Sequence, residues 1–281
     1  MPRALPRLVL RLDENAFAGN RAIDLTASRI SDYMLDRMDD GAARATVYYE
    51  LSILKRMLRI AWRRGDLHTV PLFPERGELD NAREGFFTDA DVALLQVELP
   101  EYLRGLAMFA YLTSWRKQEM LGLEWDHVDF EEGVVWLGSR RTKGKESRTF
   151  PFKDFPALQT LLESQRDYAE LWERQTNKIV TRVFTNHGKP IKNYYAAWRS
   201  ACKRAGLEGR YMHDNRRSAV RNMDRAGIPR DIAKKLSGHK TDSMYSRYNI
   251  VDDQDLNDAT AKLASYGTEP TPKDPVRTDY H

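Results

Sequence analysis

Six polar side chains in the second half of the chain are candidates for chemistry, because they combine cationic groups, imidazoles and a phenol. Guanidinium and ammonium groups bind anions, an imidazole accepts a proton, and a phenol can act as a nucleophile. Taken alone, each has an ordinary structural explanation, such as a surface ion pair, a helix cap or a packed ring. Their order and local context are therefore what matters. In chain order they are Arg116, Lys143, His213, Arg216, His239 and Tyr248.

Sequence patterns around these side chains indicate the elements that position them. Arg116 opens a helix directly after the apolar run 108–112, and His213 and Arg216 share a helix face because they are three residues apart. Residues 134–137 and 148–152 have the composition of two strands, and the basic segment 138–145 between them is typical of a hairpin turn that carries Lys143. The predicted fold class is mainly α-helical with a small antiparallel β-sheet.

Helical periodicity and capping residues predict the other elements. Residues 26–38 form a helix, and Thr46 is the expected N-cap of a second helix that stops at Gly65. Thr88 and Asp91 have the spacing of a capping box at the start of a further helix. The remaining helices are expected at 103–112, 116–123, 158–171, 194–205, 215–225, 230–236 and 252–265.

Several segments, in order, resemble those of tyrosine recombinases of the phage-integrase type. Residues 113–119, continuing to 123–129, look like the first arginine box of that family, and 142–145 with Arg148 and Pro151 resembles its catalytic-lysine hairpin. Residues 213–218 are similar to the second box, and 236–240 followed by Arg247-Tyr248 resembles the closing box. The stretch 33–71 also looks like the helical core-binding domain of the family.

The resemblance implies a role for each of the six side chains at a DNA phosphodiester. Arg116 and Arg216 would stabilise the charge of the transition state, and Tyr248 would be the nucleophile. The family implies His213 as the general base and Lys143 as the proton source for the leaving 5′-oxygen. His239 would hydrogen-bond the scissile phosphate, and Glu119 is expected to be a structural support. Neither a cofactor nor a metal ion is expected, since no zinc spacing and no Walker-type loop is present.

One rival nucleophile and two departures from the family pattern remain. Tyr245 precedes Tyr248 by three residues, and the spacing from His239 favours Tyr248. Ser114 stands where the family usually has Gly, and Asn215 stands where it usually has Leu. Neither departure removes a catalytic group, but both raise the question of full activity.

The expected domains are 1–83, 84–266 and 267–281. The first is interpreted as a helical core-type DNA-binding domain, truncated or minimal, whose breaker-rich linker follows Gly65. The second is the catalytic domain, and the third is a flexible tail. Many relatives carry an additional arm-binding domain. Residues expected to contact DNA are Lys55, Arg56, Arg59, Arg63, Arg140, Arg141 and Lys145, although a solvated helix face explains the first four equally well.

Composition excludes some classes of protein. The chain has 281 residues with one cysteine and a formal net charge of +4, so it forms no intrachain disulfide. No run of about 18 apolar residues is present, which predicts no membrane span. We expect a soluble protein of the bacterial cytoplasm whose partner is double-stranded DNA. The family implies a homotetramer on DNA, a monomer in isolation, and accessory DNA-bending proteins as further partners.

Three functions are consistent with these patterns. The leading hypothesis is site-specific DNA recombination by a phage or mobile-element integrase. A catalytically inactive DNA-binding relic would share the fold, and a type IB topoisomerase-like enzyme would share the chemistry. The target sequence, and whether the reaction is integration, excision or dimer resolution, do not follow from the sequence.

Overall fold

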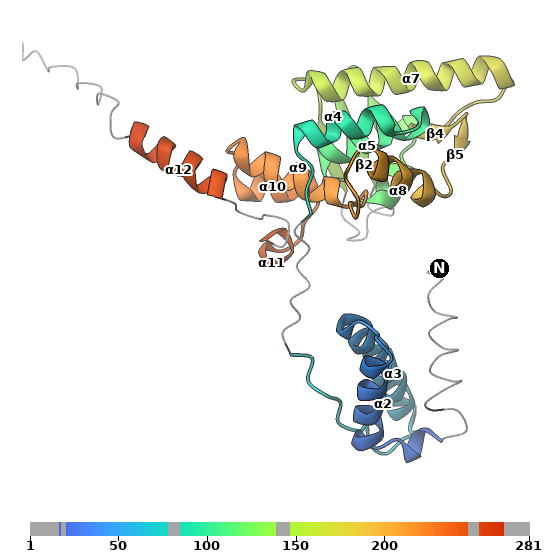
Figure 1. Ribbon diagram of the computed structural model, residues 1–281. Coiled ribbons are helices and arrows are strands. Elements are labelled where there is room, and N and C mark those ends of the chain that lie inside the picture. The colour runs from blue at the N-terminus through green and yellow to red at the C-terminus, as the bar shows by residue number, and fades with distance from the viewer. Residues whose placement is uncertain (1–16, 18–20, 78–84, 139–146, 247–252, 267–281) are drawn as a thin grey trace, which may run out of the picture. The chain divides into compact units, whose positions relative to one another are not determined.

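The computed structural model describes residue 17 and residues 21–77, 85–138, 147–246 and 253–266. The chain divides into two compact units, Met1–Arg83 and Glu84–His281, which are considered separately here (Figure 1). Within the described residues, none of the helices combines the length and apolar character that a bilayer span requires.

The first unit consists of a short 3-10 turn, η1 (Ala22–Asp24), and two packed helices, α2 (Ala27–Asp39) and α3 (Arg44–Arg64). Its buried residues include Ile30 and Tyr33 of α2 and Leu54 of α3. The predicted N-cap of the second helix is wrong. Thr46 donates its backbone N–H to the carbonyl oxygen of Ala43 at 2.8 Å, so it already lies inside the first turn.

The second unit is mainly helical, as predicted. The expected capping box at Thr88 is confirmed by reciprocal hydrogen bonds with Asp91. Helix α7 is longer than predicted at both ends: it starts at Pro156, a residue favoured in the first turn, and continues to Thr176. Helix α11 was not predicted. The helices are α4 (Asp89–Glu98), α5 (Glu101–Thr113), α6 (Lys117–Leu121), α7 (Pro156–Thr176), α8 (Tyr195–Arg204), α9 (Asp214–Arg225), α10 (Arg230–Ser237), α11 (Asp242–Ser246) and α12 (Asp253–Tyr266), with a 3-10 turn η2 (Trp125–His127).

A three-stranded antiparallel sheet has the order β1 (Val128–Asp129), β2 (Val134–Leu137), β3 (Arg148–Pro151). The two predicted strands are therefore confirmed, and Leu137 pairs with Arg148 at the open end. The hairpin turn predicted for residues 138–145 falls outside the described residues from position 139 on. A second pair, β4 (Thr185–Asn186) and β5 (Lys189–Pro190), was not predicted because each strand has only two residues.

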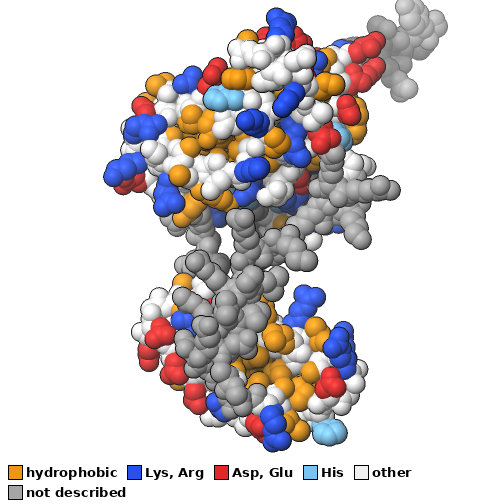
Figure 2. Space-filling view, turned by 90° about the vertical axis from the view of Figure 1, so that its right-hand side faces the viewer, with side chains coloured by type: hydrophobic (Ala, Val, Ile, Leu, Met, Phe, Trp, Pro, Cys, Tyr) orange, Lys and Arg blue, Asp and Glu red, His pale blue; other side chains and the backbone are white. Residues whose placement is uncertain are grey.

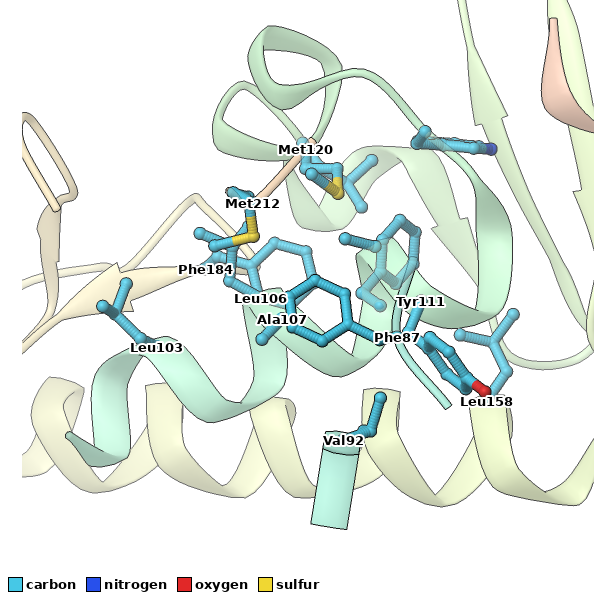
Figure 3. Packing of buried hydrophobic residues seen from close by; sticks show 14 of the residues in the cluster. Phe87, Val92, Leu103, Leu106, Ala107, Tyr111, Met120, Leu158, Phe184 and Met212 are labelled. Carbon is cyan, nitrogen blue, oxygen red and sulfur yellow. The ribbon is translucent and has the colours of Figure 1, made fainter. Parts of the chain in front are cut away.

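The core of the second unit is built around α5, which packs against both α9 and α7. Figure 3 shows buried side chains of one cluster, which includes Leu103 and Leu106 of α5 together with Phe184. Phe109 contacts the rings of Trp115 and Phe184 at centroid distances of 5.3 and 5.2 Å. This packing fixes the end of α5, where the first candidate arginine follows.

Cys202 on α8 belongs to the same core and is buried. Burial raises the pKa of its thiol to about 11. The only cysteine of the chain is thus shielded and protonated at neutral pH.

Candidate active site

Three arginine side chains from distant parts of the sequence converge on the C-terminal end of α10. Each donates to one of three consecutive residues there. The pairs are Arg148 Nη1 with the carbonyl oxygen of Ser237 at 2.8 Å, Arg116 Nη2 with the carbonyl oxygen of Gly238 at 2.9 Å, and Arg216 Nη2 with Nε2 of His239 at 2.9 Å.

Local structure explains how each arginine reaches this point. Arg116 is the residue that precedes α6, immediately after the buried end of α5. Arg148 and Phe150 lie on the buried face of β3, because side chains alternate along a strand. Arg216 lies in the first turn of α9 and is 2% exposed. Of the three, Arg116 is the most accessible, with 27% of its side chain exposed.

Glu119 holds two of these guanidinium groups together. Its carboxylate accepts from Arg116 Nη1 at 3.1 Å and from Arg148 Nη2 at 2.7 Å. It also accepts the backbone N–H of Arg116 at 2.9 Å, which closes the first turn of α6. Burial favours protonation of Glu119, but Arg148 and the contacts with Arg116 outweigh it and hold the pKa of this carboxyl below its usual value. Glu119 therefore bridges Arg116 and Arg148 from a buried position.

Gly238 is required by the closeness of this packing. Its φ of +70° lies in the left-handed region, and it ends α10. A Cβ atom at this position would collide with the guanidinium group of Arg148. Any side chain here would therefore displace Arg148 from the carbonyl oxygen of Ser237.

The contacts of His239 determine its tautomer. A guanidinium group has only donors, so Nε2 must accept from Arg216 and the ring proton is on Nδ1. Nδ1 then donates to Oγ of Ser237 at 2.7 Å, and that hydroxyl donates to the carbonyl oxygen of Ala233 at 2.7 Å. Burial, and then the nearby arginines beginning with Arg216, lower the pKa of His239 to about 3. The imidazole is neutral at pH 7.

Ser114, one of the two departures from the family pattern, contacts Arg216 directly. Its carbonyl oxygen accepts from Arg216 Nη1, and its own hydroxyl donates to the backbone oxygen of Arg216 at 3.2 Å. Its φ of +60° and ψ of +21° are left-handed, which explains why glycine suits this position. The serine side chain adds a bond that glycine lacks. Asn215, the other departure, is buried and donates from Nδ2 to the carbonyl oxygen of Met212 at 3.2 Å.

His213, the expected general base, and Tyr245, the rival nucleophile, lie in different environments. His213 precedes α9 and keeps part of its surface open to solvent, and a partial loss of hydration, followed by the charge of Arg216, lowers its pKa. Tyr245 is fully buried, and its hydroxyl donates to Asp224 Oδ1 at 2.8 Å. Burial and then Asp224 raise the pKa of Tyr245. A buried, hydrogen-bonded phenol of raised pKa is a poor nucleophile, which disfavours Tyr245 in that role.

Several predicted residues lie outside the described part of the chain: Lys143, Tyr248, Arg140, Arg141 and Lys145. On α3, Arg56, Arg59 and Arg63 are exposed, whereas Lys55 is half-buried with Nζ 5.3 Å from the ring centroid of Phe73. In Figure 2, hydrophobic side chains lie beside basic ones on the visible face of this first unit. Among the described residues, no cluster of His, Cys, Asp and Glu gathers that could hold a metal ion.

Arg148 was not assigned a role of its own from the sequence, although the structure brings it into the site. The sequence did contain an indication of this role. Arg148 alternates with Phe150 and Phe152 along the predicted strand, so all three side chains are expected on the same, inward face. An arginine at the inward position of such a strand needs a buried anionic or carbonyl partner.

Comparison with known proteins identifies the family. The model of the phage integrase family matches residues 90–255, which is more than half of the chain. The chain belongs to the phage integrase family. All three converging arginines and the end of α10 lie inside the matched region, so the site is part of the phage-integrase fold.

Among relatives, the integrase of Salmonella phage P22 is 24% identical over 233 residues, covering 81% of this chain and 59% of that protein. The shufflon-specific DNA recombinase of Escherichia coli is 27% identical over 216 residues, covering 72% of this chain and 50% of that protein. This phage-integrase chain therefore spans only half to three fifths of the length of these two relatives.

Solved structures show the same fold. The Tn1549 transposon integrase in complex with circular intermediate DNA matches with a TM-score of 0.68 at 15% identity, covering 94% of both chains. A lambda integrase tetramer bound to a Holliday junction matches with a TM-score of 0.69 at 16% identity, covering 99% of this chain and 76% of that one. The mainly helical fold with a small antiparallel sheet is thus shared with these two solved integrases.

Proposed function

We propose that this member of the phage integrase family catalyses site-specific DNA recombination, cutting and rejoining strands through a covalent phosphotyrosine at Tyr248. The observation that carries the proposal is the convergence of Arg116, Arg148 and Arg216 on the end of α10. A cationic centre assembled from distant segments fits an anionic, phosphate-like ligand.

The proposed role of Arg116 and Arg216 is to hold the non-bridging oxygens of the scissile phosphate. Attack adds charge to these oxygens, and fixed guanidinium donors stabilise that charge more in the transition state than in the ground state. Removal of one such donor lowers the rate by roughly a hundredfold or more. Because Arg216 is 2% exposed, the groups that cover it must move before a phosphate can reach it.

Proton transfer in this proposal uses His213 and Lys143. His213 has a lowered pKa and is therefore neutral at pH 7, so it can accept the phenolic proton of Tyr248. Lys143 would donate a proton to the leaving 5′-oxygen. The phenolic oxygen forms a bond to phosphorus as the bond to the 5′-oxygen breaks. The 3′-phosphotyrosine conserves the bond energy, so rejoining needs no ATP.

For His239 the proposed role differs from the one that the resemblance implied, which was a hydrogen bond to the scissile phosphate. In the described arrangement its Nε2 lone pair accepts from Arg216, so it positions the guanidinium group and has no ring proton on Nε2 to give to a phosphate. We therefore assign His239 as a positioning residue for Arg216.

Covalent capture tests this proposal. The protein is incubated with nicked suicide duplexes made from a fragmented DNA library, and protein-linked DNA is recovered under denaturing conditions and sequenced. Wild type is expected to form an adduct at a defined sequence, and Tyr248→Phe to form none while still binding DNA. Tyr245→Phe is the matched control. It removes a buried hydrogen bond to Asp224 and is expected to lower stability but retain the adduct.

Three outcomes would contradict the proposal. Adduct formation by Tyr248→Phe would place the nucleophile elsewhere. DNA binding by wild type without any adduct would instead identify the inactive relic. Relaxation of supercoiled DNA without a preferred site would indicate the topoisomerase-like activity.

The proposed partners are double-stranded DNA and further copies of this chain. Lambda integrase has been solved as a tetramer bound to a Holliday junction, and we propose a tetramer on DNA here as well. Leu256 and Leu263 of α12 are 57% and 73% exposed, and their seven-residue spacing places them on one helix face. This face is proposed to dock on a neighbouring subunit in the tetramer.

A further inference from the structure

Next to Arg116, the side chain of Lys117 joins α6 to the start of α8. Its Nζ donates a hydrogen bond to the hydroxyl of Tyr195. It also lies over two aromatic rings, 4.6 Å from the centroid of Tyr195 and 5.5 Å from that of Tyr194. The two tyrosine rings are stacked, with centroids 5.0 Å apart and an interplanar angle of 24°.

The charge of Lys117 is not neutralised by these contacts. In the described part of the chain, no carboxylate lies within ion-pair distance of its Nζ. A cation over an exposed aromatic ring gains only about 0.5–1 kcal/mol and keeps its full charge. Lys117 is half-buried, but its ammonium group lies against Tyr195, which is 52% exposed, so an anion can approach it from that side.

The hydroxyl of Tyr195 is set up to donate. Its oxygen already accepts from Lys117, and the residues that the structure describes provide no acceptor for its own hydrogen, which can be donated to a group outside the protein. Arg199 follows Tyr195 by four residues on α8, which places both on one helix face. Arg199 is exposed and, like Lys117, makes no ion pair with any carboxylate that the structure describes.

We propose that Lys117, Tyr195 and Arg199 form a second anion-binding subsite, for a DNA phosphodiester that neighbours the one held by Arg116 and Arg216. The inference rests on the proposed function. Lys117 follows Arg116 directly in the chain, so the subsite lies beside the group proposed to hold the scissile phosphate. The phosphates of a DNA strand form a continuous row of negative charge, so a cation beside one phosphate site can bind a neighbouring phosphate. This subsite would fix the position of the strand without taking part in the chemistry.

The salt dependence of DNA binding tests the subsite. Kd is measured for a short duplex over a range of NaCl concentrations, in the Tyr248→Phe background so that no adduct forms. Lys117→Met keeps the length and apolar stem of the side chain but removes one phosphate contact. The slope of log Kd against log salt is expected to fall by about 0.9. Tyr195→Phe keeps both rings and is expected to weaken binding several-fold without changing the slope.

Two controls make the result specific. Lys117→Arg retains the charge and is expected to retain the wild-type slope. Lys203→Met removes an exposed lysine near the opposite end of α8, whose partner is Glu208 at 4.0 Å, and is expected to leave the slope unchanged. An unchanged slope in Lys117→Met with a lower free energy of unfolding would overturn the proposal, because Lys117 would then only join α6 to α8. This binding readout is independent of covalent capture, so failure of the subsite and failure of the recombinase assignment are distinguishable.

Discussion

Glu119 is the residue on which two of the three arginines depend. It is buried, and its carboxylate is shared by Arg116 and Arg148. Glu119→Gln keeps the shape but removes the charge, leaving two neighbouring guanidinium groups without their common anion. Breaking a buried pair of this kind costs about 3–5 kcal/mol. The free energy of unfolding of the second unit, measured by urea denaturation, is expected to fall by about this amount.

Glu170→Gln on α7 is a matched control for this substitution. Glu170 also bridges two arginines, but both lie four residues away on the surface of the helix. Such exposed pairs contribute about 0.3–0.5 kcal/mol each. Similar losses in the two variants would show that the buried position of Glu119 has no special importance.

At the scale of elements, the backbone conformation at the end of α5 makes a testable prediction. The backbone of Ser114 lies in the left-handed region, which costs an L-residue about 1–2 kcal/mol. Ser114→Ala keeps this penalty and loses the hydroxyl bond to Arg216, so it is expected to destabilise the fold by about 1 kcal/mol. Ser114→Gly also loses the bond but removes the penalty, so its stability is expected to be close to wild type. Thermal unfolding of both variants measures this, and an alanine variant more stable than the glycine variant would contradict it.

The elements themselves were largely predictable from sequence, because helix periodicity, caps and strand alternation are local properties. Helix α11 was missed because it has only five residues, too few for a periodic pattern. The candidate site was predictable only in part. The roles of Arg116 and Arg216 came from the resemblance, whereas the contacts of Arg148 and Ser237 arise when segments 89 residues apart meet. No local pattern specifies such a contact.

At the scale of the whole molecule, the two units have separate hydrophobic cores. His239 lies in the second unit, Glu84–His281. In the unfolded chain this imidazole takes up a proton near pH 6.5, whereas in the folded unit its pKa is about 3. Between these values the unfolded state binds more protons, so the free energy of unfolding falls as the pH falls. The slope is up to about 1.4 kcal/mol per pH unit. His213, whose pKa is also lowered, adds to the effect in the same direction.

Calorimetry at several pH values checks this expectation. The transition of the second unit is expected to move to lower temperature as the pH drops below 6.5. In His239→Gln, which does not titrate, the same transition is expected to depend less on pH. An equal pH dependence in wild type and variant would show that His239 is not held neutral in the fold.

The shielded thiol of Cys202 makes the chain convenient for site-directed labelling. A cysteine introduced at an exposed position of α3 and another on α7 would react with maleimide dyes far faster than the native one. Förster transfer between the dyes would then report how the separation of the two units changes when a duplex is added, without first removing the native residue.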